Sequence, residues 1–392
     1  MSINARSLIT VGAFFSLSLV GMSRTFTGTA LPAIRTTLVV TILQAGTLTA
    51  LLQLGFSAAV FFGGPISDIY KRSLILKMGC LLMGIHLIFF GHSEGFWLAL
   101  VSMAFVGIGG GLIESSSNPL LVQLYPGRES SIMNLHHFFF AMGSLAGPII
   151  MGTLLANSIP WQWGYIGFGI FVLSLCIFLP VKSVPAHQNT RGFDVRQIER
   201  LMIDRTFLSL FFVLFFNSGV QNGICFWMVS FLKETRGLSI ALASFSLFLF
   251  FACAAVGRLL ASYVITRIHE AMYLPGLLSL FLLSLLLAVL VPGAWSIPFF
   301  ALCGFAHSGI TPSLLGVVGR CYSEIPGTAM GILATGAGLG SVVVPWLMSL
   351  VSQLTTLKTG FLSLNFFIVI ALLLMGTQVR RLKQIIPSRA LV

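Results

Sequence analysis

Long apolar runs fill most of the chain, and polar residues gather in short segments between them. Each run is about the length that an α-helix needs to cross a bilayer, roughly 20 residues at about 1.5 Å of rise per residue. The pattern therefore predicts an all-α membrane protein with twelve membrane-spanning helices. Their approximate bounds are 8–33, 42–69, 73–92, 96–124, 130–156, 163–181, 207–232, 239–266, 272–291, 295–319, 326–352 and 359–379.

The longest polar stretch, residues 182–205, lies between the sixth and seventh apolar runs. Within it, VRQIERLMI spaces Val195, Ile198, Leu201 and Met202 as an apolar stripe among charges. Such a stripe is typical of a short helix lying at the inner membrane surface, and a solvated linker with some helicity is the alternative. Either way, the sequence predicts a six-helix bundle at 1–181, a cytoplasmic linker at 182–205 and a second six-helix bundle at 206–392.

The two predicted bundles repeat one another. Residues 133–148 and 330–345 share the same spacing of Met, Gly and Pro at an offset of 197 residues. Parallel repeats of this kind are typical of transporters whose substrate binds near the membrane midplane between the halves. The glycines that keep the offset are Gly143 with Gly340 and Gly107 with Gly304.

Composition and charge placement agree with a membrane protein. The chain is 57% hydrophobic and 8% charged, whereas soluble domains carry about 25% charged residues. The net charge of +12 is not a nucleic-acid signal, because the cations lie in the loops. An N-terminus inside the cell places sixteen Lys and Arg on cytoplasmic segments and four outside. The positive-inside rule therefore predicts a multi-pass protein of the plasma (inner) membrane with both termini in the cytoplasm.

The sequence gives little evidence for an enzyme active site or a metal site. Six cysteines are scattered through the apolar runs, and none forms a CxxC pair, which argues against a disulfide framework or a cysteine metal site. No further ligand residues stand at metal spacing near His136 and His137. Walker loops and HExxH patterns are absent from the sequence. We therefore expect neither an enzyme nor a bound metal or cofactor.

Polar residues interrupt the fourth and fifth apolar runs at helical spacing. Glu114 and Asn118 are four residues apart and share one helix face, and Asn134 and His137 share a face of the next helix. An ionisable group inside a membrane helix usually faces a wet cavity or a partner. These residues predict a polar path for a small-molecule substrate.

Arg24 lies well inside the first apolar run. A guanidinium group offers five donors in a planar fork, so Arg24 can clamp an anion or a hydroxyl group; snorkelling to the headgroups is the alternative. Glu114 is the expected proton carrier, and pairing with Arg24 would link its protonation to substrate binding. A purely structural, hydrogen-bonded glutamate is the other possibility.

The candidate substrate-binding residues of the second bundle are uncharged. Asn217, Gln221 and Trp227 combine amides with an aromatic platform, which suits a hydroxylated ligand. The same residues could equally hold helices together by hydrogen bonds. His307 and Thr311 form the corresponding face of the tenth helix.

The loop GGPISDIYKR after the second helix resembles the loop motif of the major facilitator superfamily, roughly G-x-x-x-D-R-x-G-R-R. Gly64, Asp68 and Arg72 match it, whereas Ile69, Lys71 and Ser73 depart from it. The resemblance implies that Asp68 and Arg72 help to latch the two halves. It also implies the twelve-helix, 6+6 architecture.

A narrower resemblance is to the fucose-permease-like branch of sugar:proton symporters. It is carried by GGGLIESSSNP, NLHHFFFAMGSLAGP, NSGVQNGICFW and GRLLASYVITR. The branch implies acidic residues in helices 1, 4 and 7 for sugar binding and proton coupling, and it favours His137 over His136 at the site. Here Arg24 and Gln221 replace two of the acids, which leaves Glu114. Arg258, in the fourth segment, is expected to be structural or gating.

The sequence thus predicts a monomeric secondary transporter that moves a sugar or sugar derivative by alternating access, coupled to a proton or another ion. Arg24 favours an anionic substrate such as a sugar acid. Three alternatives stay open: an exporter of amphipathic compounds, a lysolipid or glycolipid carrier, and a non-transporting sensor or partner subunit. The exporter is suggested by the antiporter-like spacing of Gly143, Gly147, Pro148 and Gly152.

Overall fold

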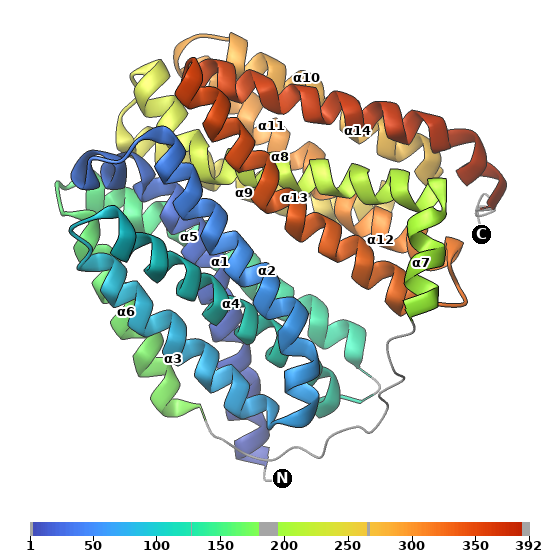
Figure 1. Ribbon diagram of the computed structural model, residues 1–392, viewed down its shortest axis with the longest axis horizontal. Coiled ribbons are helices and arrows are strands. Elements are labelled where there is room, and N and C mark those ends of the chain that lie inside the picture. The colour runs from blue at the N-terminus through green and yellow to red at the C-terminus, as the bar shows by residue number, and fades with distance from the viewer. Residues whose placement is uncertain (1–2, 127, 180–194, 265–266, 386–392) are drawn as a thin grey trace. The chain divides into compact units, whose positions relative to one another are not determined.

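The structure is a computed structural model that describes the backbone of residues 3–126, 128–179, 195–264 and 267–385. The described residues form helices and no strand (Figure 1). The helices are α1 (Ile3–Leu38), α2 (Ile42–Ile69), α3 (Arg72–Gly91), α4 (Phe96–Leu124), α5 (Glu129–Ala156), α6 (Trp161–Phe178), α7 (Val195–Ile203), α8 (Arg205–Arg236), α9 (Ile240–Val264), α10 (Glu270–Leu290), η1 (Gly293–Trp295), α11 (Ser296–Ser308), α12 (Ile310–Cys321), α13 (Pro326–Leu354) and α14 (Leu357–Ile385).

Eleven of the described helical segments are long and apolar enough to cross a membrane, when η1, α11 and α12 are taken as one segment. Helix α6 is also apolar but shorter. Helices therefore stand at every position where the apolar runs predict them. That all twelve cross the membrane stays a prediction, because α6 falls short of the length that the others have.

The tenth predicted helix, 295–319, is divided into two. Helices α11 and α12 meet at Gly309, which caps both. Pro312 has no backbone N–H, so the carbonyl of Ser308 loses its normal helical partner. The hydroxyl of Ser313 donates to the Gly309 carbonyl at 2.6 Å and satisfies the next acceptor. Pro312 accompanies this break but does not by itself explain it, because α1, α4, α5, α10 and α13 each continue through an internal proline.

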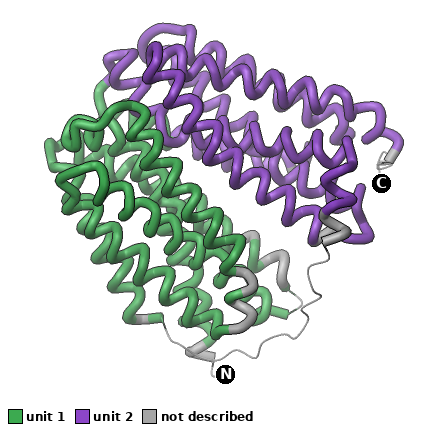
Figure 2. Tube along the Cα trace, viewed as in Figure 1, with its two compact units in different colours: residues 1–190, 239–248 green, residues 191–238, 249–392 purple. Residues whose placement is uncertain are grey.

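The chain divides into two compact units (Figure 2). Unit 1 comprises Met1–Thr190 with Ser239–Phe248, and unit 2 comprises Arg191–Leu238 with Leu249–Val392. The first turns of α9 therefore belong to unit 1 and the remainder to unit 2.

Unit 1 is built on close helix contacts at glycines. A Cβ atom at Gly143 of α5 would overlap the backbone carbonyl of Ser18 in α1, and one at Gly107 of α4 would overlap that of Leu52 in α2. Lipid tails are as apolar as leucine side chains, so van der Waals contact between helices replaces the hydrophobic effect as the packing force. The missing side chains allow the backbones themselves to meet.

Unit 2 repeats both contacts. Gly340 of α13 meets the backbone of Phe215 in α8, and Gly304 of α11 meets that of Phe250 in α9. The members of the first contact lie 197 residues after their counterparts in unit 1. In the second contact the glycine is offset by 197 residues and the phenylalanine by 198. The duplication inferred from the sequence is therefore present at the level of individual helix contacts.

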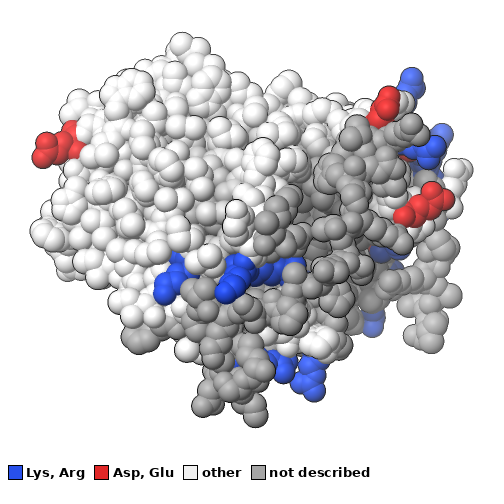
Figure 3. Space-filling view, turned by 60° about the horizontal axis from the view of Figure 1, so that its bottom comes forward, with Lys and Arg blue, Asp and Glu red and all other residues white. Residues whose placement is uncertain are grey.

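Charged groups are sparse on the surface between helix ends. In the face drawn in Figure 3, uncharged residues cover a broad area, and Lys and Arg side chains appear at its lower middle and its upper right. Large apolar side chains are exposed elsewhere on the described surface, for example Trp97, Ile177 and Leu259. A belt of exposed apolar side chains is expected where lipid rather than water is the solvent.

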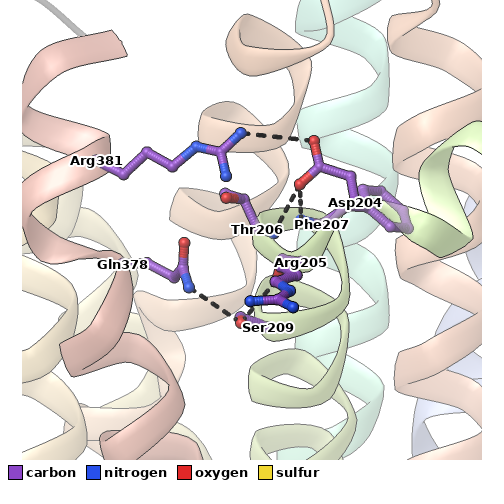
Figure 4. Close-up of polar contacts among 7 residues, drawn as sticks. All are labelled: Asp204, Arg205, Thr206, Phe207, Ser209, Gln378 and Arg381. Carbon is purple, nitrogen blue, oxygen red and sulfur yellow. Dashed lines mark hydrogen bonds and ion pairs between the residues drawn. The ribbon is translucent and has the colours of Figure 1, made fainter.

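Asp204 organises the junction between α7 and α8 (Figure 4). Its Oδ1 accepts hydrogen bonds from the backbone N–H groups of Thr206 at 2.7 Å and Phe207 at 3.3 Å. It thereby caps α8, whose first N–H groups have no helical partner. Its other oxygen lies 3.8 Å from Arg381 of α14. One carboxylate thus joins the linker helix to two membrane helices.

Neighbouring contacts support this junction. Gln378 donates to the hydroxyl of Ser209 at 3.1 Å (Figure 4). The ring of Tyr322, at the end of α12, packs edge-on against Phe207 with 5.5 Å between centroids. Burial and the nearby Asp204 carboxylate raise the pKa of Tyr322, so its phenol stays protonated at neutral pH.

The glycine contacts predict that replacing glycine by alanine destabilises the protein at some positions and not at others. Gly340→Ala places a methyl group against the Phe215 backbone, whereas Gly331, on the same helix, has nothing within 4 Å of an added Cβ. We expect Gly340→Ala to lower the free energy of unfolding by about 1–3 kcal/mol, and Gly331→Ala to leave it unchanged or raise it by up to about 1 kcal/mol, because alanine has the higher helix propensity. Thermal unfolding of the detergent-purified variants measures both. Equal losses at the two positions would contradict the packing argument.

Two substitutions separate the capping role of Asp204 from its ion pair with Arg381. Asp204→Ala removes the cap and should lower the free energy of unfolding by about 0.5–2 kcal/mol. Asp204→Asn keeps a capping oxygen but removes the negative charge, and with it the ion pair with Arg381, whose side chain is 52% exposed; such a pair is worth at most about 1 kcal/mol. Denaturation midpoints of the two variants should therefore differ. An asparagine variant as unstable as the alanine variant would show that the ion pair, not the cap, is the stabilising contact.

Candidate functional site

A small recess in unit 1 surrounds Arg24 of α1. Its volume is about 10 Å³, about the space that a single water occupies. Helices α1, α2 and α4 supply its walls. The lining residues are Val20, Ser23, Arg24, Leu52, Gln53, Phe56, Val106, Gly107 and Gly110.

Two aromatic rings flank the Arg24 guanidinium group. Its central carbon lies 4.2 Å from the ring centroid of Phe56 and 5.7 Å from that of Phe140. A cation over an aromatic face is stabilised by about 2 kcal/mol when it is desolvated, so the membrane helix can hold this charge. The side chain is half-buried, which leaves part of it accessible.

Gln53 of α2 lines the same recess and was not singled out from the sequence. Its side chain is 3% exposed, and its Oε1 has no hydrogen-bond partner among the described residues. Ser23, the other neutral polar residue of the recess, already donates to the Val20 carbonyl at 2.8 Å. The signal that could have found Gln53 is an amide in the middle of the apolar run 42–69.

Glu114 and Asn118 continue the α4 face that begins in the recess. Glu114 lies one helical turn beyond Gly110, and Asn118 one turn beyond Glu114. Both are half-buried, and the buried Oδ1 of Asn118 accepts no hydrogen bond from the described part of the chain. The two residues therefore share a face, as their spacing predicts. The predicted pairing of Glu114 with Arg24 stays a prediction.

The two adjacent histidines of α5 differ in environment. His136 is fully buried, with its Nε2 2.9 Å from the hydroxyl of Ser117 on α4. His137 is exposed on unit 1. His136 therefore joins α5 to α4, and the exposed His137 stays a predicted substrate contact. The side chain of Asn134, the remaining α5 candidate, lies outside the described residues.

The unit 2 candidates gather near the break between α11 and α12. Asn217 of α8 donates to the hydroxyl of Thr311 at 3.4 Å. The ring of His307 stacks on Phe250, with 5.4 Å between centroids and 4° between planes. Asn217 Oδ1 and His307 Nε2 are buried and have no hydrogen-bond partner within the described ranges. These orphan atoms are available to a hydroxylated ligand or to water.

Three further candidates lie on α8 and α9. Trp227 of α8 is fully buried, and its indole N–H finds no acceptor among described residues. Gln221 is half-buried on the same helix. Arg258 is exposed on α9.

The repeat places the two candidate sets at equivalent positions. Gln221 lies 197 residues after Arg24, Thr311 lies 197 after Glu114, and His307 lies 197 after Gly110. The glycine that opens the recess in unit 1 is thus replaced in unit 2 by a stacked imidazole. The charged residues Arg24 and Glu114 of unit 1 are replaced in unit 2 by the amide of Gln221 and the hydroxyl of Thr311. Equivalent positions therefore hold charged candidate residues in unit 1 and uncharged candidate residues in unit 2.

Both units also carry a polar clasp at one end of neighbouring helices. In unit 1, Arg72 of α3 donates to Oε1 of Gln123 of α4 at 3.1 Å. In unit 2, Arg320 of α12 pairs with Glu270 of α10 at 2.6 Å. Glu270 lies 198 residues after Arg72, and Arg320 lies 197 after Gln123. The arginine of the clasp therefore lies on α3 in unit 1, whereas in unit 2 it lies on α12, at the position equivalent to Gln123 of α4. The side chain of Asp68, the other predicted latch residue, lies outside the described residues.

Comparison with known protein families decides the class of this chain. The model of the Major Facilitator Superfamily matches residues 13–345 and 210–390. The chain belongs to the Major Facilitator Superfamily. It is therefore a membrane transporter by family, as the loop motif and the helix pattern predict.

Two distant relatives by sequence cover most of the chain. "Uncharacterized MFS-type transporter YfkL" of Bacillus subtilis is 22% identical over 312 residues, 76% of this chain and 78% of that protein. "Putative glucose/galactose transporter" of Helicobacter pylori strain J99 is 24% identical over 335 residues, 78% of this chain and 81% of that protein. The second relative carries a sugar-transporter name.

Solved structures share the fold of this superfamily member. A bacterial homologue of the human lysosomal transporter Spinster, in an inward-facing and unoccupied conformation, has a TM-score of 0.84 at 18% identity and covers 100% of both chains. FucP in its outward conformation has a TM-score of 0.62 at 17% identity and covers 96% of this chain and 99% of its own. The TM-scores show a common fold, and at identities this low the fold is all that the likeness shows.

The clasp in unit 2 can be tested by converting its Arg–Glu pair into the Arg–Gln pair of unit 1, with the arginine on α10. Glu270→Arg sets two cations together and should lower the free energy of unfolding by about 1–3 kcal/mol; the lower end applies because the Arg320 side chain is 40% exposed. Adding Arg320→Gln recreates the Arg–Gln pair of unit 1 and should recover most of that loss. Thermal unfolding of the single and double variants tests this, and an unrescued double variant would show that the pair does not act as a clasp.

Proposed function

We propose that this superfamily member is a twelve-helix secondary active transporter of a small polar organic solute, a sugar or sugar derivative with a negative charge. Transport proceeds by alternating access and is coupled to protons. The protein acts as a monomer in the inner membrane, surrounded by lipid, with both termini in the cytoplasm. The observation that carries the proposal is Arg24, a half-buried cation in a membrane helix beside a recess.

The surroundings of Arg24 favour anion binding over snorkelling. The flanking rings of Phe56 and Phe140 hold the guanidinium group against α2 and α5. A snorkelling arginine instead extends along its helix toward water. A guanidinium fixed in this way presents a preorganised fork to a carboxylate.

Neutral polar groups support a hydroxylated substrate. Gln53 and Asn118 in unit 1 each carry a buried polar atom without a partner among the described residues. Leaving such atoms unsatisfied costs about 1–3 kcal/mol each, and substrate hydroxyl groups can recover that cost. The sugar-transporter name of the Helicobacter relative is consistent with this chemistry.

Glu114 is the proposed proton carrier. It lies on the same α4 face as Gly110, one turn from the recess. A carboxyl group at the border between apolar helices and a cationic site can exchange its proton as the anion arrives and leaves. Coupling to protons then follows without a metal or an organic cofactor.

The experiment that tests the proposal is a thermal-shift screen of the purified protein with neutral sugars, sugar acids, lysolipids and lipophilic cations. A ligand present at about 100 times its dissociation constant adds about 2.7 kcal/mol of stability. We expect sugar acids to stabilise the protein most. Stabilisation only by lysolipids or lipophilic cations would instead favour a lipid carrier or an exporter of amphipathic compounds.

Arg24 should dominate the affinity for the anionic ligand. Arg24→Ala removes charge-assisted hydrogen bonds of about 1.5–3 kcal/mol, so the dissociation constant for a sugar acid should rise about 10- to 150-fold. Arg267→Ala, a control at an exposed arginine between α9 and α10, should leave it unchanged. Titration calorimetry on both variants gives the comparison. Unchanged affinity in Arg24→Ala would remove the anionic substrate from the proposal.

A further inference from the structure

The recess in unit 1 presents two groups with opposite hydrogen-bonding character. Arg24 only donates hydrogen bonds, whereas Oε1 of Gln53 only accepts them. Both residues line the same recess, Arg24 from α1 and Gln53 from α2. A ligand that satisfies both must offer an acceptor anion and a donor hydroxyl close together.

We propose that the recess binds a carboxylate whose neighbouring carbon carries a hydroxyl group. Arg24 binds the carboxylate, and Oε1 of Gln53 accepts the hydrogen bond of the 2-hydroxyl. This inference rests on the proposed function and narrows its substrate class to 2-hydroxy acids, among them the acids derived from sugars. Gln53 is then a specificity-determining residue.

The sizes of the groups fit this assignment. The recess holds about 10 Å³, the space for one water-sized group, and a single hydroxyl is a group of that size. Arg24 is half-buried, whereas Gln53 is 3% exposed. The carboxylate therefore binds the accessible side of the guanidinium group while the hydroxyl enters the recess.

Gln53 Oε1 is the buried acceptor of the recess that has no hydrogen-bond partner among the described residues. Ser23 donates its hydroxyl hydrogen to the Val20 carbonyl, and the remaining lining residues are apolar or glycine. Gly107 and Gly110 leave the space open because they carry no side chain. In unit 2, His307 stands at the position equivalent to Gly110. The paired recognition of carboxylate and hydroxyl thus belongs to unit 1.

The inference is tested with four ligands of one size. D-Gluconate carries both groups, 2-deoxy-D-gluconate lacks the 2-hydroxyl, 3-deoxy-D-gluconate lacks only the next one, and D-glucitol lacks the carboxylate. We expect wild-type protein to bind 2-deoxy-D-gluconate about three- to tenfold more weakly than 3-deoxy-D-gluconate, the loss of one neutral hydrogen bond. D-Glucitol should bind more weakly still. Titration calorimetry gives the four dissociation constants.

The Gln53→Leu variant links that preference to the side chain. It removes the acceptor at nearly constant size, so the difference between the two deoxy acids should vanish. Gln384→Leu, the same substitution at the exposed end of α14, should keep the difference. The thermal midpoint of each variant without ligand shows that both are folded.

The outcomes separate this inference from the proposed function. Equal binding of the two deoxy acids by wild-type protein overturns the role of the 2-hydroxyl while leaving anion transport in place, and this comparison needs no variant. A preference that persists in Gln53→Leu overturns the assignment to Gln53. Failure of every sugar acid to bind overturns both proposals.

Discussion

Hydrocarbon supplies no hydrophobic force between helices and no hydrogen bonds to polar groups, so close packing has to hold the bundle together. The glycine faces of α4 and α5 meet that requirement by bringing backbones into contact. The same constraint builds the candidate site. Gly107 contacts the Leu52 backbone and also lines the recess beside Arg24. A side chain at Gly107 would therefore push α2 away and fill the space where a ligand group can bind. Helix packing and the shape of the recess thus depend on the same glycine residues.

Duplication explains why the scaffold is repeated while the chemistry differs. Equivalent glycine contacts recur in both units, because losing one costs packing energy in either half. Residues that do not carry these contacts have diverged. Gln221 replaces Arg24, Thr311 replaces Glu114, and the clasp arginine has moved from α3 to α12. The charged candidate residues Arg24 and Glu114 therefore lie in unit 1, and their equivalents in unit 2 are uncharged.

The sequence predicts the helices well because a membrane span needs a long apolar run, and such runs can be counted directly. It also places Arg24 and Glu114 in spans, since charges there are rare. The remaining features depend on helix rotation and packing. His136 and His137 point about 100° apart, and only the packed structure shows that His136 is the buried one. Gln53 is one amide in an apolar run, and its missing partner appears only when its neighbours are placed. The break at Gly309 could not be predicted from Pro312, because prolines lie inside five helices that continue unbroken.

The most direct measurement of the central claim is uptake of radiolabelled D-gluconate into liposomes that contain the purified protein. The account predicts saturable uptake that an inward-directed proton gradient accelerates, because protonation of Glu114 accompanies entry of the anion. In Glu114→Gln the gradient should no longer accelerate uptake, while exchange of labelled for unlabelled gluconate continues. Uptake that is absent for sugar acids and neutral sugars alike, or that ignores the gradient in the wild-type protein, would contradict a proton-coupled carrier of polar anions.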